Sequence, residues 1–300
     1  MPLQFSVFFS ERPGVSRTTP PGKEHLEWVP TTSTLIYGAT DAVLVDTQLT
    51  ERASQDLAKW VVEFGKKLTT IYITHGHGDH FFGTAALLHH YPDAKVVATP
   101  EVVAHVENQR SPAVLGTLWE KLFPGQLPSS LLTAAALSAG EDLTLEGERL
   151  VVVPTGHTDT DNTTTLWVPS IGLAVTGDAV YNNTHPYMRE SASQEARREW
   201  IVALGRIAAL QPINVVGGHS DPRRGFDPRS IQETKSYLHD LERLDHQTDN
   251  AVDLYHQMLE LHPDRLNVGS LWGAASLLKQ DAQVPAVKGG EVEDRKPDMG

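Results

Sequence analysis

The sequence contains no cysteine. This absence excludes disulfide bonds, thiolate metal ligands and a cysteine nucleophile, and it fits a cytoplasmic protein. Basic residues are also few: 25 lysines and arginines stand against 38 aspartates and glutamates, so the formal net charge is −13. We expect no binding to nucleic acid or to an anionic membrane surface, because a chain this acidic repels both.

Long apolar runs are missing too. No run reaches the roughly 18 apolar residues that a membrane-spanning helix needs. The N-terminal segment lacks a basic region before its short apolar run, which predicts a first strand and not a signal peptide. The composition is that of a globular protein, and we expect a single domain over residues 1–280. Residues 281–300 are rich in glycine, proline and charge, which predicts a flexible tail.

Strand and helix patterns alternate along the chain. Apolar, β-branched runs predict strands at 42–46, 68–74, 95–98, 149–153, 164–168, 172–176 and 213–216. Helical periodicity predicts helices that follow Thr50, that cover 83–90 and that cover 194–210. Strands mixed with helices in both halves indicate layered packing of helices against sheets.

Two segments are mainly helical in pattern. Residues 100–139 are interrupted by prolines, and we interpret them as an inserted cap over the central sheet. Residues 227–279 predict C-terminal helices with one amphipathic face. Packing in the core is the first interpretation of that face, and a contact between two copies in a homodimer is the second. The face is formed by Tyr237, Leu241, Leu244, Tyr255, Met258 and Leu259.

The strongest signal is the segment Thr74–His80, which reads THGHGDH at the end of a predicted strand. The side chains of His75 and His77 project the same way in an extended chain, so one metal ion can take both imidazoles. Asp79 and His80 point elsewhere in the turn and can serve a second metal nearby. A histidine-rich surface loop is the alternative, but it does not explain the order of the residues.

Three more candidate ligands follow other predicted strands. His157, Asp178 and His219 each come after an apolar run and directly after a glycine. Loops at strand ends are common places for functional sites. Taken singly, a hydrogen-bonded loop histidine is the more common interpretation. Together with the first cluster, they make two sites of nitrogen and oxygen ligands, which suit zinc and also iron or manganese.

Between about residues 29 and 220 the sequence resembles the metallo-β-lactamase superfamily. The resemblance rests on seven positions, which are His75, His77, Asp79, His80, His157, Asp178 and His219. It implies an αββα sandwich with two zinc ions at one edge of the two sheets. It further implies that the first metal is held by His75, His77 and His157. The implied ligands of the second metal are Asp79, His80 and His219, with Asp178 as the bridge.

Hydrolysis is the chemistry that such a centre favours. Two divalent cations lower the pKa of a bridging water toward neutrality, and the resulting hydroxide attacks a polarised carbonyl or phosphoryl group. We expect Asp79, Asp178 and Tyr181 to be the catalytic residues. Tyr181 lies three residues after Asp178, as in the acyl-homoserine lactone hydrolases that this segment resembles, whose phenol hydrogen-bonds the ester. A tyrosine that only packs the loop is the alternative.

Other positions depart from the family pattern. Phe81 and Phe82 follow the first cluster, and they are expected to line an apolar substrate pocket or to pack in the core. His185, Tyr187 and Met188 are further candidates for substrate binding, with a solvated loop as the alternative. Two acids after the third histidine, Asp159 and Asp161, either orient metal ligands or cap a turn.

These residues favour an enzyme that opens a small cyclic ester or amide: a lactone first, a lactam or cyclic carbamate second. Thioester hydrolysis of the glyoxalase II type is an alternative, although Arg223 and Arg224 are the only basic pair near His219 to receive a glutathione tail. A second alternative is a mononuclear iron dioxygenase that oxidises persulfides. A non-enzymatic interaction module is the least favoured alternative, because non-catalytic members of this fold usually lose metal ligands.

Overall fold

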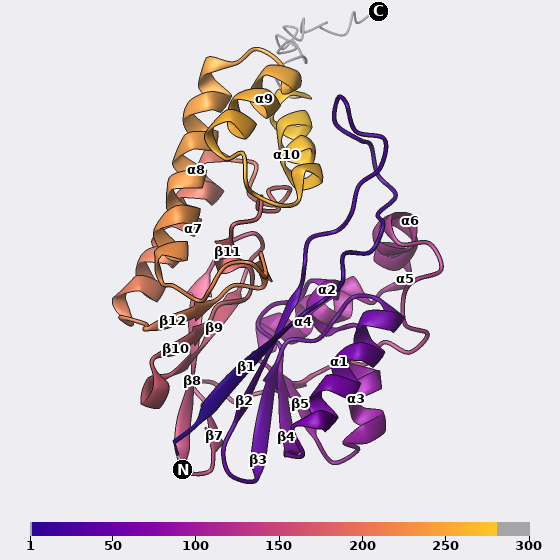
Figure 1. The fold of residues 1–300 in the computed structure, drawn as a ribbon, viewed down its shortest axis with the longest axis vertical. Helices are drawn as coiled ribbons and strands as arrows, with labels where there is room; N and C mark the ends of the chain where they lie inside the picture. Colours follow the sequence, from indigo (N-terminus) through magenta and orange to yellow (C-terminus); the bar gives the residue numbers. More distant parts are fainter. Residues whose placement is uncertain (1, 281–300) are drawn as a thin grey trace, which may run out of the picture.

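The structure is a computed structural model that describes residues 2–280, so the predicted tail lies outside the described residues. Two mixed sheets face each other (Figure 1). The first sheet has the order β1 (Gln4–Phe9), β2 (Thr32–Tyr37), β3 (Asp41–Val45), β4 (Lys67–Tyr72), β5 (Lys95–Ala98) and β6 (Ala135–Ala136). The second has the order β12 (Asn214–Val216), β10 (Leu173–Val175), β9 (Thr163–Val168), β8 (Glu148–Gly156) and β7 (Leu143–Leu145).

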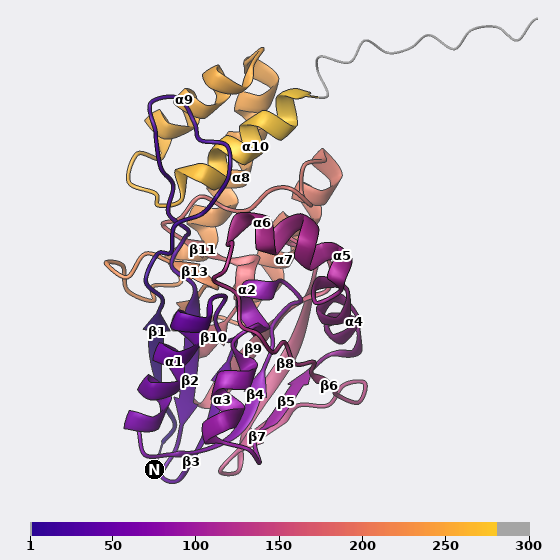
Figure 2. The same cartoon turned by 90° about the vertical axis from the view of Figure 1, so that its right-hand side faces the viewer.

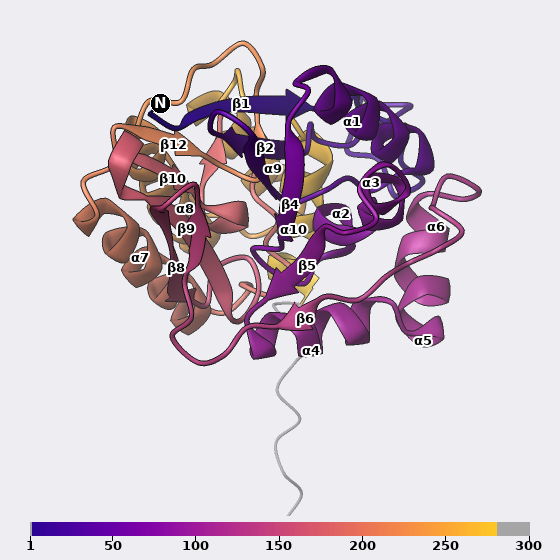
Figure 3. The same cartoon turned by 90° about the horizontal axis from the view of Figure 1, so that it is seen from below.

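Helices cover the outer face of each sheet. The first sheet carries α1 (Glu51–Glu63), α2 (Gly78–Phe81), α3 (Thr84–His90) and α4 (Pro100–Gln109). The second carries α7 (Gln194–Ala209), α8 (Arg229–Gln247), α9 (Ala251–Leu261) and α10 (Val268–Gln280). Figure 3 shows the four layers side by side. The αββα sandwich that the resemblance implied is therefore confirmed.

Strand β3 shows why the sequence folds this way. Val43 and Val45 are completely buried between the two sheets, and Ala42 and Leu44 are buried against the helices on the other face. A strand covered on both faces reads as a continuous apolar run. The next helix, α1, begins where the hydroxyl of Thr50 accepts a hydrogen bond from the backbone amide of Ala53.

The inserted segment is helical only in its first part. After α4 come α5 (Pro112–Val114), a π-helical turn (Leu115–Trp119) and α6 (Glu120–Leu122), and the chain then adds β6 to the sheet edge. The sequence missed β6, because a two-residue Ala-Ala strand exists only through its parallel partner β5. Figure 2 shows α5 and α6 above α2, whereas α4 lies beside the first sheet.

The amphipathic face of the C-terminal helices packs inside the chain. Its residues belong to the core between the second sheet and α7–α10, and Tyr237, Leu241 and Met258 are completely buried. Core packing is thus the correct interpretation, and this face is not available to a second copy. Among residues 2–280, no helix combines the length and the apolar character that crossing a membrane requires.

Parallel strands place several loops at one edge. β3, β4 and β5 run parallel, as do β10 and β12, so their carboxyl ends lie together. Above this edge lie α9, α10 and the chain between β1 and β2 (Figures 1 and 2). Leu26 in that chain packs against Gly269 of α10, where an added Cβ would come within 3.1 Å of it.

Candidate metal centre

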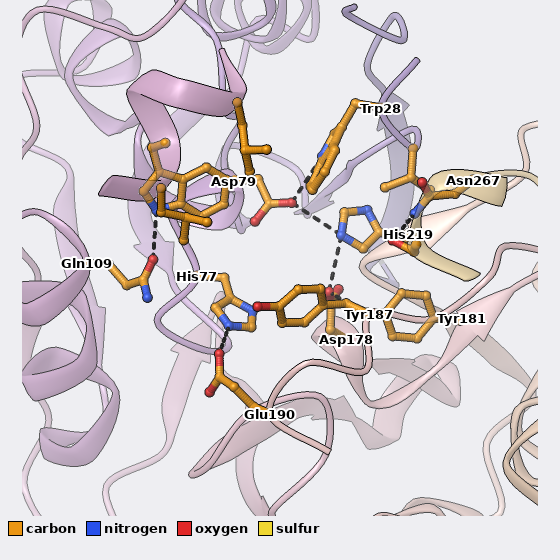
Figure 4. Close-up of a pocket in the computed structure, with 15 residues that line it drawn as sticks. Trp28, His77, Asp79, Gln109, Asp178, Tyr181, Tyr187, Glu190, His219 and Asn267 are labelled. Atoms are coloured by element: carbon orange, nitrogen blue, oxygen red, sulfur yellow. Dashed lines mark hydrogen bonds and ion pairs between the residues drawn. The ribbon is translucent and has the colours of Figure 1, made fainter. Parts of the chain in front are cut away.

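The first cluster at this edge joins residues from two segments. Asp79 and His80 lie on α2, the first helix after β4, and His219 follows β12 in the short strand β13 (His219–Ser220). One ligand atom from each of the three lies within 4.8 Å of the others. His219 Nε2 is 3.3 Å from Asp79 Oδ2 and 3.1 Å from Asp178 Oδ2 (Figure 4). The expected second-metal ligands are therefore brought together beside the expected bridging carboxylate.

The second cluster contains His75, His77, Asp159 and Asp178, again with ligand atoms within 4.8 Å of one another. His75 Nε2 is 4.0 Å from Asp178 Oδ2. His77 Nε2 is 3.0 Å from Glu190 Oε1 (Figure 4). Its Nδ1 faces Asp159 Oδ2, also at 3.0 Å. Asp178 therefore contacts residues of both clusters, as expected for a ligand that bridges two metal ions.

His157 is placed differently from the expectation. Its Nδ1 is 2.6 Å from Asp161 Oδ1 and its Nε2 is 2.9 Å from Ser191 Oγ. Among the described residues it belongs to none of the groups that could hold a metal ion. The ring is held by these two partners, and the structure brings Asp159 to the cluster instead. Of the seven residues in the predicted signature, six converge.

Asp46 is a positioning residue that the sequence did not assign to the site. It follows β3, and its Oδ2 lies 3.0 Å from His80 Nδ1 and accepts a hydrogen bond from the Thr74 hydroxyl at 2.7 Å. Its Oδ1 accepts the backbone amide of Thr74 at 2.8 Å. The signal was present, since the apolar run of β3 ends in this acid, but its partners come from the neighbouring strand and were not visible.

Replacing Asp46 by asparagine is expected to weaken metal binding by roughly 10- to 100-fold, the usual cost of losing a group that orients a ligand histidine. Competition with a chromogenic chelator measures this change. Asp41→Asn, at the opposite end of the same strand, is the matched control. Equal affinities in the two variants would contradict the role of Asp46.

The converging atoms fit a metal site. His75 Nε2, His80 Nε2, Asp159 Oδ2 and Asp178 Oδ1 are buried and have no hydrogen-bond partner among the described residues. Buried polar atoms are normally paired, so a group of orphans indicates a missing partner. Their neighbours orient them: the Pro30 carbonyl accepts from His219 Nδ1 at 3.3 Å, which leaves Nε2 for a cation. The nitrogen and carboxylate donors suit zinc, iron or manganese.

Charges of both signs balance in the cluster. Burial raises the pKa of Asp178, but His219 and His80 outweigh it and hold that pKa well below its ordinary value. Burial lowers the pKa of His219, and the carboxylate of Asp178 outweighs it and raises the pKa to about 9. Burial also raises the pKa of Asp159 to about 6, against the attraction of His77. A divalent cation would take the place of the imidazole protons.

Close backbone packing fixes the bridging carboxylate. An added Cβ on Gly218 would lie 2.1 Å from Asp178 Oδ1, so only glycine fits beside it. Gly177 has a φ of +51°, and an added Cβ there would lie 2.4 Å from the Thr74 hydroxyl oxygen. The glycines that precede His219 and Asp178 are therefore required by the close approach of two strands.

Tyr181 contacts the centre through Asp178. The Tyr181 hydroxyl donates a hydrogen bond to Asp178 Oδ2 at 2.7 Å, and the ring is completely buried at the wall of the cavity. In this arrangement the phenol proton is used on the carboxylate and not on a substrate. We therefore describe Tyr181 as a positioning residue.

Tyr181→Phe is expected to lower metal affinity or activity by about 10- to 100-fold, because the carboxylate loses one of the partners that orient it. Metal content after dialysis and the rate of hydrolysis both report this loss. Tyr255→Phe, at a buried tyrosine of α9 outside the cluster, is the control. A Tyr181→Phe protein that matches the wild type in both measurements would reduce the tyrosine to a packing residue.

The clusters open into a small cavity of about 50 Å³. Its polar lining includes His77, Asp79, Asp178, Glu190 and His219 (Figure 4). Its remaining walls are mostly aromatic and aliphatic, namely Trp28, Val29, Leu118, Trp119, Leu122 and Tyr187. The Trp28 indole nitrogen lies 3.4 Å from Asp79 Oδ2. The inserted segment thus supplies part of the wall, which the sequence alone did not show.

The expected substrate residues divide into two groups. Tyr187 lines the cavity, and Met188 lines the adjoining outer pocket. Phe81 and Phe82 are buried in the core beneath the helices and do not line the cavity, so the pocket interpretation was wrong for both. His185 is completely buried, with its Nδ1 3.0 Å from the Tyr237 hydroxyl, and it too lies outside the cavity.

One protein family matches most of the chain in sequence. The family model described as metallo-beta-lactamase superfamily matches residues 26–246. The chain belongs to the metallo-β-lactamase superfamily. Superfamily members are generally hydrolytic metalloenzymes, which agrees with the converging histidines and carboxylates. No curated protein matches the chain in sequence.

Solved structures share the fold. A metallo-β-lactamase family protein from Thermus thermophilus is 22% identical, with a TM-score of 0.61, over 93% of this chain and 95% of that one. A metallo-β-lactamase from Pontibacter korlensis is 17% identical, with a TM-score of 0.56, over 79% and 99%. The mono-zinc form of a metallo-β-lactamase from Pseudomonas aeruginosa is 15% identical, with a TM-score of 0.54, over 80% and 96%. At these identities the similarity supports the superfamily fold alone.

Proposed function

We propose that this chain is a zinc-dependent hydrolase that opens a small cyclic ester or amide: a lactone first, a lactam or cyclic carbamate second. The observation that carries the proposal is the opening of the ligand clusters into a narrow, largely apolar cavity of about 50 Å³. A compact neutral ring fits such a space, and a charged polymer does not.

Each residue has a defined part in the proposed reaction. When bound, two zinc ions would lower the pKa of water toward neutrality and polarise the ring carbonyl. His75, His77, His80 and His219 would hold them together with Asp79 and Asp178. Tyr181 keeps Asp178 in place. Asp79 lines the cavity beside His219 and is placed to carry a proton to the leaving oxygen or nitrogen. Trp28 and Tyr187 would exclude bulk water from the ring.

A larger outer pocket, of about 500 Å³, adjoins the cavity. It shares Trp28, Leu118, Leu122, Tyr187 and Ser270 with the inner cavity. Trp272 of α10 lines it, together with the guanidinium side chains of Arg17 and Arg189. An apolar substituent of the ring would fit there, and a carboxylate on that substituent would meet one of the two arginines.

Glutathione thioesters are less well supported. Arg223 pairs with Asp221, with Nη2 2.7 Å from the carboxylate, so its charge is already partly balanced before any glutathione carboxylate binds. Arg224 borders a separate surface pocket and not the metal centre. One observation favours the iron dioxygenase as a second candidate: His75 and His77 converge with carboxylates, a ligand type found in non-haem iron oxygenases.

A pH-stat comparison tests the proposal. Metal-quantified protein is offered γ-lactones with short and long acyl chains, a lactam with a carboxylate, a cyclic carbamate and a glutathione thioester. We expect proton release with at least one ring substrate. Silence on every ring together with thioester turnover would contradict the proposal. Iron as the retained metal, with oxygen consumed on a persulfide, would favour the second candidate.

A further inference from the structure

The loop between β8 and β9, residues 157–162, carries both an expected ligand and an unexpected one. His157 begins the loop and Asp159 follows two residues later. The side chain of Asp159 is completely buried, whereas that of Asp161 is 79% exposed. The sequence offered the same two interpretations for both aspartates, which were orientation of a metal ligand and capping of a turn. The fold buries Asp159 and leaves Asp161 exposed to solvent.

The two oxygens of Asp159 have different environments. Oδ1 accepts a hydrogen bond from the Thr158 hydroxyl at 3.0 Å, which fixes the carboxylate. Oδ2 is buried and faces His77 Nδ1 at 3.0 Å. Asp159 contributes one carboxylate oxygen to the group in which the ligand atoms of His75, His77, Asp159 and Asp178 lie within 4.8 Å of one another.

His157 cannot use the same space in this arrangement. Both of its ring nitrogens have partners outside the cluster, at Asp161 and Ser191. The serine hydroxyl in turn donates to the Thr158 carbonyl, so the ring is tied to its own loop. His77 differs from His157, because its Nδ1 faces Asp159 inside the cluster, whereas neither partner of His157 belongs to the cluster.

We propose that Asp159, in place of His157, completes the ligand set of the first metal. His75, His77 and Asp159 then hold this metal beside the bridging Asp178, and His157 stays outside the ligand set, hydrogen-bonded to Asp161 and Ser191. The proposal rests on the metal centre and not on the substrate. A carboxylate oxygen is a harder ligand, in the sense of hard and soft donors, than an imidazole nitrogen. This ligand set therefore shifts the preference toward manganese or iron, compared with a set of three histidines.

Metal stoichiometry and affinity test this assignment without any activity measurement. Full-length wild type, Asp159→Asn, His157→Ala and Asp161→Asn are dialysed, their zinc is quantified by mass spectrometry, and affinities are measured against a chromogenic chelator. Asp159→Asn should lose one bound equivalent or bind it at least tenfold more weakly. His157→Ala and the matched loop control Asp161→Asn should keep the wild-type stoichiometry and affinity.

Two results would overturn the assignment. One is retention of both the stoichiometry and the affinity in Asp159→Asn, and the other is loss of metal in His157→Ala. Melting curves recorded in chelator separate loss of a ligand from loss of fold, since every variant should unfold like the metal-free wild type. If the wild type hydrolyses no ring substrate, and Asp159→Asn is the variant that loses metal, the proposed function is wrong and this inference stands.

Discussion

Replacing Asp178 by alanine is expected to lower the rate of metal-dependent hydrolysis by about 1000-fold or more. One side chain faces both ligand clusters: Asp178 Oδ1 is 3.3 Å from His80 Nε2 in one cluster, and Oδ2 is 4.0 Å from His75 Nε2 in the other. Its loss removes the ligand shared by the two ions, and a metal centre stabilises the transition state by several kcal/mol. At about 1.4 kcal/mol for each tenfold in rate, that corresponds to about three orders of magnitude.

The measurement is turnover of the best ring substrate together with bound metal per chain. Asp178→Asn keeps the shape beside Gly218 and should show the same loss, which separates charge from packing. Asp249→Ala, at an exposed aspartate between α8 and α9, should behave like the wild type. Circular dichroism should show an intact sandwich for all three. Turnover at the wild-type rate in Asp178→Ala would rule out the bridging role.

Removing the metal is expected to lower the melting temperature by roughly 10 °C. A ligand present at about 1000 times its dissociation constant stabilises the folded state by about 4 kcal/mol, and each kcal/mol shifts the melting temperature of a large domain by about 2–4 °C. The centre also concentrates buried carboxylates, with Asp79, Asp159 and Asp178 all at most 3% exposed. Without cations, only the neighbouring imidazoles balance these charges.

Thermal melts in zinc, in manganese and in chelator check this expectation, and adding zinc back to the chelated protein should restore the higher temperature. Asp178→Ala provides the internal control, because its melting temperature should respond much less to chelator. If the wild type melts at one temperature under all conditions, the buried cluster is stable without cations, and the case for a resident metal fails.

Local residue order allowed much of the fold to be predicted from the sequence. The apolar run of β3, the Thr50 cap of α1 and the amphipathic pattern of α8 each appear in the structure where the sequence placed them. Periodicity and capping are local properties, so they survive without tertiary information. Strands β6, β11 (Tyr181–Asn182) and β13 were missed because each has only two residues and depends on a distant partner.

The metal centre too was predicted from the sequence only in part. The sequence by itself indicated which residues could bind a metal, because histidines and aspartates that follow parallel strands lie at one shared edge of the two mixed sheets. Only the tertiary structure decided which of them converge. Asp46 reaches His80 from the neighbouring strand, Asp159 lies where His157 was expected, and Phe81 and Phe82 turn into the core. Side-chain direction in a loop depends on contacts far apart in the chain, and those contacts exist only once the two sheets have packed together.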